Sequence, residues 1–235
     1  MAHGAISGVA LVIPVIDESL TIGEVVRAVP SGLVDAVIVV DGGSRDDTVA
    51  RAREAGANVL VEPRAGYGAA CLAGARAAPA ACGVIAFIDG DGSDDPADLL
   101  RIVAPVLSGE QDFVIGSRTR GEREPGSMGS HQALAGLLAG WMIRLLYGVR
   151  YTDMGPLRAI RRDALEALGM RERTYGWNLE MQMRAARAGL RILEVPVRHR
   201  NRAGGVSKVA GSLKGTLRAS WQLATTLARV ALQAR

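Results

Sequence analysis

The sequence predicts an α/β fold, in which a mostly parallel central sheet is flanked by helices. Two observations predict it. Short apolar runs alternate with segments of helical character along the first half of the chain, which is the order of strands and helices in a parallel sheet. Three of these runs stop abruptly at acidic residues or glycines, so the loops that follow them are expected to meet at one edge of the sheet.

The strands predicted in the first half are continuous apolar runs, a pattern typical of strands that are buried on both faces. They span residues 8–15, 36–40, 58–62, 84–88 and 112–115. The helices predicted between them span residues 20–28, 48–55, 69–78 and 96–107. Ser19 is the predicted cap of the first helix, and Gly56 is predicted to end the second.

The second half of the chain has a less regular pattern. Residues 121–130 are polar and rich in glycine, which predicts a loop. Residues 199–208 predict another loop, which is basic and also contains glycines. Predicted helices span residues 163–168, 179–188 and 212–233, and a last predicted strand spans residues 191–197.

Residues 132–148, QALAGLLAGWMIRLLYG, form a strongly apolar segment that is interrupted by Arg144. The segment is too short and too interrupted to span a bilayer. Two interpretations are open. It is either a helix packed in the core, or a helix that lies on a membrane or covers a lipid.

Composition narrows the class of partner. The chain has 28 basic and 24 acidic residues and a formal net charge of +4, which suits phosphate-bearing small molecules, anionic lipid surfaces or nucleic acid. Aromatic residues make up only 4% of the chain, which disfavours nucleic acid because base stacking needs them. The start of the chain has no signal-peptide pattern, and the two cysteines lack metal-site spacing. We therefore expect a cytoplasmic protein with reduced cysteines.

The stretch VIAFIDGDGSDDP, residues 84–96, carries the strongest chemical signal. An apolar strand ends in Asp89 and Asp91, at the edge of the sheet where open α/β sheets bind ligands. Two carboxylates so close repel each other unless a cation lies between them, and Mg²⁺ or Mn²⁺ suits such oxygen ligands while leaving room for phosphate oxygens. The alternative is an acidic turn that caps the next helix, with Asp95 before Pro96 as the N-cap.

Six motifs occur in order along the chain: LVIPVIDES, VVDGGSRDDT, FIDGDGSDDP, VIGSR, TDMGPLRAIRRDAL and EMQMRAARAGLRILEVPVRHRNRAGGVSK. Together they resemble glycosyltransferase family 2, which has the nucleotide-sugar-binding GT-A fold, and within it the polyprenyl-phosphate (dolichol-phosphate) mannosyl- and glucosyltransferases. The resemblance spans residues 8–208. It implies a GT-A catalytic domain over residues 1–211, and a C-terminal helix over residues 212–235 that belongs to the same domain or contacts a membrane surface or a second copy.

The resemblance implies a donor site built by the first three motifs. Pro14, Asp17 and Glu18 match the motif that contacts the nucleoside, and Asp41 matches an acid used for the nucleotide base or ribose. Asp89 and Asp91 match the Asp-x-Asp pair, in which the first acid contacts the nucleotide sugar and the second binds the metal. The basic positions associated with donor or acceptor phosphate are matched by Arg118, Arg202 and Lys208. Some relatives use a histidine near His199 as a further metal ligand.

The acceptor side has two candidate catalytic acids besides Asp91. The resemblance implies that Asp153 lines the acceptor and that Glu180 lies where some relatives that glycosylate hydroxyl groups have a base. The alternatives are that Asp153 caps a turn and that Glu180 pairs with Arg184, four residues on along a helix. Arg158 and Arg161 either hold an acceptor phosphate or form a basic surface.

The sequence as a whole predicts a metal-dependent, inverting glycosyltransferase that uses Mg²⁺ or Mn²⁺. It would move a hexose from a UDP- or GDP-sugar to an acceptor, first of all a polyprenyl phosphate. The open alternatives are the same enzyme class with a soluble hydroxyl acceptor, and a nucleotide-sugar-binding protein without catalysis. Peripheral contact with the inner membrane face and a homodimer are further expectations, whereas nucleic acid is not an expected partner.

Overall fold

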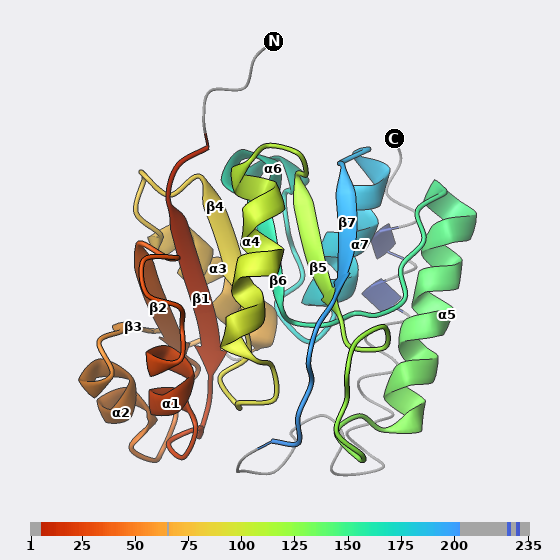
Figure 1. Cartoon of the computed structure of the whole chain (residues 1–235). Coiled ribbons are helices and arrows are strands. Elements are labelled where there is room, and N and C mark those ends of the chain that lie inside the picture. Colours follow the sequence, from red (N-terminus) through yellow and green to blue (C-terminus); the bar gives the residue numbers. More distant parts are fainter. Residues whose placement is uncertain (1–5, 65, 203–224, 227–228, 231–235) are drawn as a thin grey trace.

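The computed structural model describes residues 6–64, 66–202, 225–226 and 229–230. Its centre is a seven-stranded sheet with the strand order β3-β2-β1-β4-β6-β5-β7 (Figure 1). The strands are β1 (Val9–Val15), β2 (Ala36–Asp41), β3 (Asn58–Val61), β4 (Val84–Phe87), β5 (Phe113–Ser117), β6 (Arg158–Arg161) and β7 (Ile192–Pro196). Only β6 runs against its neighbours, β4 and β5, so the predicted α/β fold with a mostly parallel sheet is confirmed.

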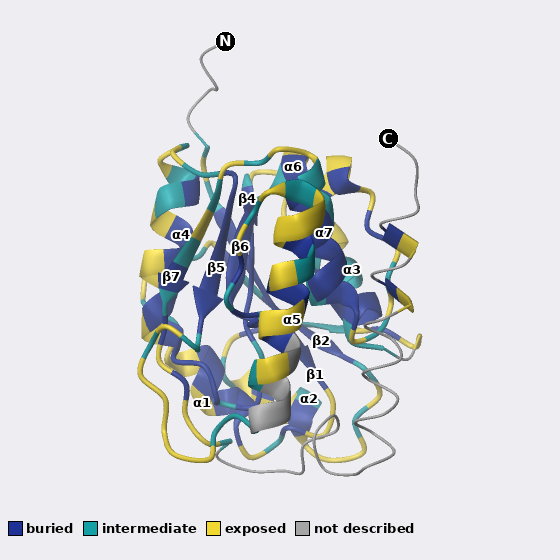
Figure 2. Ribbon diagram, turned by 90° about the vertical axis from the view of Figure 1, so that its right-hand side faces the viewer, coloured by how far each residue is buried: buried dark blue, intermediate teal, exposed yellow. Residues whose placement is uncertain are grey.

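Helices cover both faces of this sheet (Figure 1). They are α1 (Ile22–Arg27), α2 (Thr48–Glu54), α3 (Tyr67–Ala77), α4 (Leu99–Leu107), α5 (Ser130–Tyr147), α6 (Arg162–Leu168) and α7 (Trp177–Arg187), with a short 3₁₀ turn, η1 (Pro96–Asp98), before α4. Apolar side chains of α1, α2 and α4 pack on one face, and those of α3, α6 and α7 on the other. Helix α5 packs against α7 on the outside of the second layer (Figure 2).

The continuous apolar run of β1 reflects its position in the middle of the sheet. All seven of its residues are buried. Val9, Leu11 and Ile13 belong to the apolar cluster on the α4 side, whereas Ala10 and Val12 belong to the cluster on the α3 side. Successive side chains of a strand point to opposite faces, so a strand covered on both sides must be apolar at every position.

Strand β6 was not predicted from the sequence. It is only four residues long, Arg-Ala-Ile-Arg, and therefore has no apolar run that would indicate a buried strand. Because β6 is antiparallel to its neighbours, its first residue lies towards the edge where β4 and β5 end, and its last residue lies at the opposite edge. The residues that precede β6 thus reach the same edge as the loops that follow β1, β2 and β4.

The predicted helix ends are only partly confirmed. Helix α1 begins at Ile22, after Thr21, and no side chain caps it, so the prediction that Ser19 caps this helix was wrong. The predicted cap at Asp95 is confirmed, because its side chain accepts a hydrogen bond of 3.0 Å from the backbone N–H of Ala97. Gly56 follows α2 with φ +92°, as expected of a residue that ends a helix.

Most of the predicted terminal helix, residues 212–233, lies outside the described residues. Within the part of the chain that the structure describes, no helix is sufficiently long and apolar to cross a membrane. Cys71 and Cys82 are both buried and form no disulfide bond.

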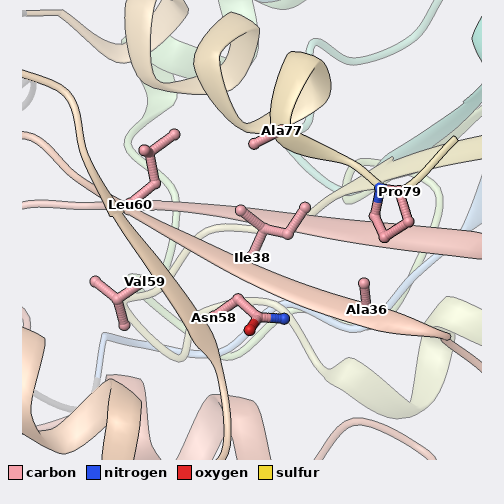
Figure 3. Close-up of a pocket in the computed structure, with 7 residues that line it drawn as sticks. All are labelled: Ala36, Ile38, Asn58, Val59, Leu60, Ala77 and Pro79. Carbon is pink, nitrogen blue, oxygen red and sulfur yellow. The ribbon is translucent and has the colours of Figure 1, made fainter.

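A small hollow opens beside the edge strand β3 (Figure 3). Its walls are formed by the beginnings of β2 and β3 and by the end of α3, with Ala36, Ile38, Val59, Leu60, Ala77 and Pro79 around a single polar side chain, Asn58. Because β2 and β3 begin here, the hollow lies at the edge of the sheet opposite to the predicted site. It has no titratable side chain, so it offers no group for acid–base or metal chemistry.

Candidate active site

The carboxyl ends of the parallel strands bring the predicted acids together at one edge of the sheet. Asp17 and Glu18 follow β1, Asp41 is the last residue of β2, and Asp89 and Asp91 follow β4. Strands β1, β2 and β4 are neighbours, which is why residues so distant in the sequence share one edge. This is the place where open α/β sheets bind ligands.

The loops after β1 and β2 are tied together through Ser44. The carboxylate of Asp41 accepts hydrogen bonds from the N–H groups of Gly43 (3.0 Å) and Ser44 (3.1 Å), and from the Ser44 hydroxyl. The backbone N–H of Asp17 donates to Oγ of Ser44 (2.8 Å), while Oδ1 of Asp17 accepts from the N–H of Arg45 (2.8 Å). Asp17 has φ +51°, a left-handed conformation that aspartate adopts more readily than most residues. The predicted nucleoside-binding acids therefore form one ordered unit.

The guanidinium group of Arg202 lies between two of the predicted site acids. Its Nη2 donates to Oε1 of Glu18 (3.0 Å), and its Nε forms an ion pair with Oδ2 of Asp91 (2.7 Å). The other oxygen of Asp91, Oδ1, accepts from the N–H of Ser93 (2.9 Å). The structure thus brings Glu18, Asp91 and Arg202 together, with a cationic side chain in contact with the acid that was predicted to bind a metal.

Asp89 is the acid whose charge is least compensated. Its Oδ1 atom is buried and has no hydrogen-bond partner among the described residues. Burial, followed by the negative charges of Asp91 and Asp94, raises the pKa of Asp89 to about 8. Tyr67, at the start of α3, is also close: burial and the charge of Asp89 raise the pKa of its phenol. Tyr67 was not predicted as a site residue, although GYGAAC was interpreted as a helix start near the donor site.

These two carboxylates fit a hard divalent cation. Asp89 offers an unpartnered buried oxygen, and Asp91 offers an oxygen that already attracts a cation, the Arg202 guanidinium. Carboxylate oxygens are the ligands that Mg²⁺ and Mn²⁺ prefer. No group of three or more histidine, cysteine, aspartate or glutamate side chains in the described ranges is arranged to hold a metal. A cation here would therefore keep coordination sites for other oxygen ligands.

The remaining acids of the DGSDDP stretch have structural partners. A basic segment, residues 198–202, runs along them: Arg198 pairs with Asp95 (3.0 Å) and its backbone N–H donates to Asp98 (2.8 Å). Arg200 pairs with the same Asp95 (2.6 Å). These contacts neutralise Asp95 and Asp98 and hold the segment where Arg202 can reach the site. The sequence reasoning missed them, although the alternation in RHRNR is a visible signal.

His199 lies in the middle of the basic segment and is buried. Its Nδ1 atom is 3.3 Å from Oδ1 of Asp94, and its backbone bridges to Asp94 and Arg123. The contact that the structure gives this imidazole is thus with Asp94.

The second cationic position, Arg118, is bound by Asp153. Nε and Nη2 of Arg118 donate to the two oxygens of Asp153 (2.8 and 2.9 Å), and the backbone N–H of Arg118 adds a third hydrogen bond (2.9 Å). Burial acts to raise the pKa of Asp153, but the Arg118 guanidinium outweighs it and holds that pKa below its usual range. Asp153 is therefore a charged, fully engaged carboxylate, and it reaches this edge because it precedes the antiparallel strand β6.

Glu180 lies fully buried in the first turn of α7. One of its oxygens accepts from the backbone N–H groups of Arg171 (3.0 Å) and Glu172 (2.6 Å), and the other accepts from Nε of Arg184 (2.9 Å). The pairing with Arg184 that the sequence offered as an alternative is thus present. These contacts hold the loop before α7, and a catalytic role of Glu180 stays a prediction.

Two arginines that were considered for an acceptor phosphate are not exposed at this edge. Arg158 is completely buried, lies 5.9 Å from the ring centre of Phe113, and donates to the carbonyl oxygen of Asn178 (3.3 Å). Arg161 pairs with Asp112 (3.0 Å) at the opposite edge of the sheet. The interpretation that they bind phosphate was wrong, because β6 is a buried antiparallel strand that holds one arginine inside and carries the other away.

Two predicted donor-site residues, Pro14 and Lys208, have no described side-chain contact with the acids of the site. Pro14 is buried within β1, in register with Val40 of β2. Lys208 lies outside the described residues.

Comparison with known proteins shows the family of the chain. The family model described as glycosyl transferase family 2 matches residues 10–169. An uncharacterized glycosyltransferase of Mycobacterium tuberculosis is 40% identical over 210 residues, which cover 89% of this chain and 93% of the relative. The undecaprenyl-phosphate mannosyltransferase of Micrococcus luteus is 33% identical over 211 residues, with 83% of each chain covered.

Solved structures include a similar fold. The glucosyl-3-phosphoglycerate synthase of Mycobacterium tuberculosis, in complex with Mn²⁺, UDP and glucosyl-3-phosphoglycerate, superposes with a TM-score of 0.75 at 26% identity. The match covers 95% of this chain and 80% of the synthase. The family model spans more than half of the chain, and its relatives match along most of their length. The chain therefore belongs to glycosyl transferase family 2 and is a hexosyltransferase with the GT-A fold.

Proposed function

We propose that this glycosyltransferase moves a hexose from a UDP- or GDP-sugar to a polyprenyl phosphate, with inversion at the anomeric carbon. The observation that carries the proposal is the pair Asp89 and Asp91 at the carboxyl edge of the sheet, where one buried carboxylate oxygen lacks a partner in the described protein. Further support comes from the undecaprenyl-phosphate mannosyltransferase of Micrococcus luteus, which is similar over most of this chain.

Asp89 and Asp91 are the residues that we assign to Mg²⁺ or Mn²⁺. When bound, such an ion supplies positive charge that stabilises the diphosphate leaving group. The complex of the similar synthase with Mn²⁺ and UDP supports this assignment. Because Oδ2 of Asp91 is paired with Arg202, Arg202 has to leave this oxygen when a cation binds, and its charge then becomes available to the diphosphate. Lys208, six residues further on, is proposed for the same phosphates.

The nucleoside end of the donor is assigned to the ordered unit after β1 and β2. Asp17 and Asp41 are fixed there through Ser44, and Glu18 stands between this unit and Arg202. Pro14 is proposed to shape the start of this loop. A preformed loop of this kind binds a ligand without having to be ordered first.

The environments of the two candidate bases, Asp153 and Glu180, support one class of acceptor. A sugar hydroxyl needs a base to accept its proton, whereas a phosphate monoester is already an anion. Asp153 is engaged by Arg118, and Glu180 by Arg184 and two backbone N–H groups. Neither is available as a free base, and this favours the phosphate acceptor. Its oxygen forms the new bond to the anomeric carbon as the bond to the diphosphate oxygen breaks, and the nucleoside diphosphate leaves.

In this scheme Arg118 positions the acceptor phosphate, and Asp153 positions Arg118. Burial opposes the charge on Arg118, but the hydrogen-bonded Asp153 and the nearby Asp94 and Asp89 raise its pKa, so it stays cationic. Arg118 thus holds a fixed positive charge next to the acids of the donor site. Glu180 acts at a distance, by holding the loop before α7.

A soluble acceptor is the second candidate. One observation favours it: the similar synthase has been solved with phosphoglyceric acid, a small soluble molecule that also carries phosphate. We also propose that residues 1–211 form the catalytic domain, with residues 212–235 as a C-terminal helix. The protein is further proposed to be cytoplasmic and a homodimer. A nucleotide-sugar-binding protein without catalysis is the weaker alternative, because the chain has both the acid pair and the basic positions.

The proposal is tested in two steps. First, the thermal unfolding temperature is measured with each UDP- and GDP-sugar in the presence of Mn²⁺, of Mg²⁺ or of a chelator. We expect one donor to raise it, and only with the metal, since a ligand that binds the folded state stabilises that state. Second, that donor is incubated with a polyprenyl phosphate or with phosphoglycerate. Glycosylated lipid supports the proposal, whereas transfer to phosphoglycerate alone, or binding without any transfer, overturns it.

A further inference from the structure

Helix α5 presents its large apolar side chains to solvent rather than to the core. Six of them are between 43% and 69% exposed: Leu134, Leu137, Leu138, Trp141, Leu145 and Leu146. Figure 2 shows the helix at the outside of the molecule, with exposed positions along its length. Scattered apolar residues on a surface are ordinary, but a continuous group of this size on one helix marks an interaction surface.

The exposed residues form a stripe because of their spacing. Leu134, Leu138, Trp141 and Leu145 follow one another at intervals of three or four residues, which places them on one side of the helix. We call this side, together with Leu137 and Leu146, the apolar stripe. The core contact of α5 does not use it. The opposite side packs inward through glycines, Ala139 and Ile143, so the core packing of α5 does not account for the large side chains of the stripe.

That inward side contains glycines where the helix approaches the backbone of residues 151–153. A Cβ atom on Gly140 would lie 2.1 Å from the carbonyl oxygen of Tyr151, and one on Gly136 would lie 3.8 Å from Cα of Asp153. Ala139 and Ile143 complete the buried side. Helix α5 therefore buries two glycines, an alanine and Ile143, while six of its large apolar residues face outward, unlike a usual surface helix, whose outward side is polar.

The charged side chains of α5 and of the residues just after it have one sign. Helix α5 contains no aspartate or glutamate, and Arg144 is exposed on the side of Leu137 and Trp141. Arg150 is exposed just beyond the end of the helix. A helix with leucines and a tryptophan on its outer side, cations beside them and no acids is complementary to a bilayer with anionic headgroups.

We propose that the apolar stripe of α5 docks this enzyme onto an anionic membrane surface. The inner side of the same helix lies against Asp153, which holds Arg118, so the membrane would lie about one helix diameter, roughly 10 Å, from the acceptor side of the site. The inference deepens the proposed function, since a polyprenyl phosphate has to be taken from a bilayer. The docking itself does not depend on which acceptor is used.

The experiment is flotation of the full chain with vesicles of equimolar phosphatidylcholine and phosphatidylglycerol, and with vesicles of phosphatidylcholine alone. The test variant is Leu138→Asp with Leu145→Asp. The matched control is Leu100→Asp, because Leu100 on α4 is 56% exposed and Leu138 is 57% exposed, on different faces of the molecule. Thermal unfolding and metal-dependent binding of the donor are measured for each variant, so that loss of folding is recognised.

We expect the wild type and the Leu100 variant to float with the anionic vesicles, less at high salt, and the stripe variant to bind at least about tenfold more weakly. Equal binding of all three proteins, or no binding at low salt, would overturn the proposal. So would a dimer in size-exclusion chromatography with light scattering that the stripe variant disrupts, because the occupant would then be a second copy. Vesicle binding without transfer to polyprenyl phosphate would overturn the proposed acceptor and leave the docking intact.

Discussion

The Nε atom of Arg202 lies 2.7 Å from Oδ2 of Asp91, and this places a guanidinium group where a metal-binding carboxylate would meet its cation. The same group donates to Glu18 (3.0 Å), so Arg202 neutralises two acids at once. A guanidinium and a divalent ion cannot both occupy this side of the Asp91 carboxylate. In the proposed metal site, a cation on this oxygen would therefore have to displace the Arg202 side chain.

Replacing Arg202 by alanine should tighten the binding of Mn²⁺ to the free chain. The substitution removes a competing charge, and we expect roughly a fivefold gain, about 1 kcal/mol, with turnover of the donor reduced. Titration calorimetry with Mn²⁺ alone measures the first effect. Arg202→Lys, which keeps a charge at this position, is the control and should change Mn²⁺ affinity less. Equal or weaker Mn²⁺ binding by the alanine variant would contradict the competition.

Asp91→Ala should abolish metal-dependent turnover of the nucleotide sugar while the protein stays folded. We expect at least about a 10³-fold loss of kcat, because the stabilisation of the leaving diphosphate is removed. Release of nucleoside diphosphate is the measurement, with circular dichroism to check the fold. The control is Asp163→Ala, which removes an exposed carboxylate at the other edge of the sheet. Full activity of the Asp91 variant would exclude a metal role for this residue.

The pair of Arg118 and Asp153 should behave as one unit towards the acceptor. We expect Asp153→Asn and Arg118→Ala each to reduce kcat/KM for the acceptor by about tenfold or more, and the double variant to be little worse than Arg118→Ala, because coupled residues are not additive. Steady-state kinetics of the three variants over a range of pH provide the test. If Asp153 were a base instead, its asparagine variant alone would lose the acidic limb of the pH–rate profile.

Glu180→Ala should reduce the free energy of unfolding by about 2–4 kcal/mol, since it leaves buried backbone N–H groups and the Arg184 guanidinium without their acceptor. Glu180→Gln retains an acceptor oxygen and should destabilise less. Urea unfolding of both variants measures the difference. A glutamine variant that is as stable as the wild type but inactive, with an altered pH profile, would instead support the catalytic role predicted from the sequence.

Stability should also depend on pH through Asp112, outside the site. Hydrogen bonding to Arg191, together with the charge of Arg161, lowers the pKa of Asp112 from 3.8 to about 2. The folded-state pKa is depressed, so this stabilisation is present above about pH 4 and is lost as the pH falls towards 2. Asp112→Asn should therefore be about 1–2 kcal/mol less stable at pH 7 and similar to the wild type at pH 2. Asp163→Asn, which removes an exposed partner of Arg161, is the control, and a constant difference across this range would argue against the pairing.

The parallel strands could be predicted because burial on both faces leaves a direct trace in the sequence. Every residue of β1 is buried, so β1 is an unbroken apolar run. Strand β6 is equally internal but has an arginine at each end, and its first arginine is buried by hydrogen bonds to backbone carbonyl groups and by the ring of Phe113. The groups that stabilise this buried arginine come from residues distant in the chain, so no local sequence pattern indicates that the arginine is buried.

The acids of the site could be predicted because they follow predicted strands. The basic residues that pair with the neighbouring acids could not. Asp41, Asp89 and Asp91 directly follow strands, and the ends of parallel strands meet. The cations that pair with Asp95 come from Arg198 and Arg200, about a hundred residues later. The length of the intervening chain does not determine where the chain returns to the sheet. The sequence therefore presents the acids after β4 as one run, and only the fold separates those that are paired with arginines from those that remain for the site.

Gly136 and Gly140 have a mechanical consequence. At Gly140 the helix meets the backbone of Tyr151 with no room for a side chain, whereas at Gly136 a Cβ would just reach Asp153, and protein interiors are hardly compressible. A tilt or shift of the helix axis cannot be absorbed by rotamer changes at these two contacts, so the segment with Asp153 has to follow it. The orientation of Arg118, which Asp153 holds, then depends in part on what binds to the apolar stripe on the outside of the helix.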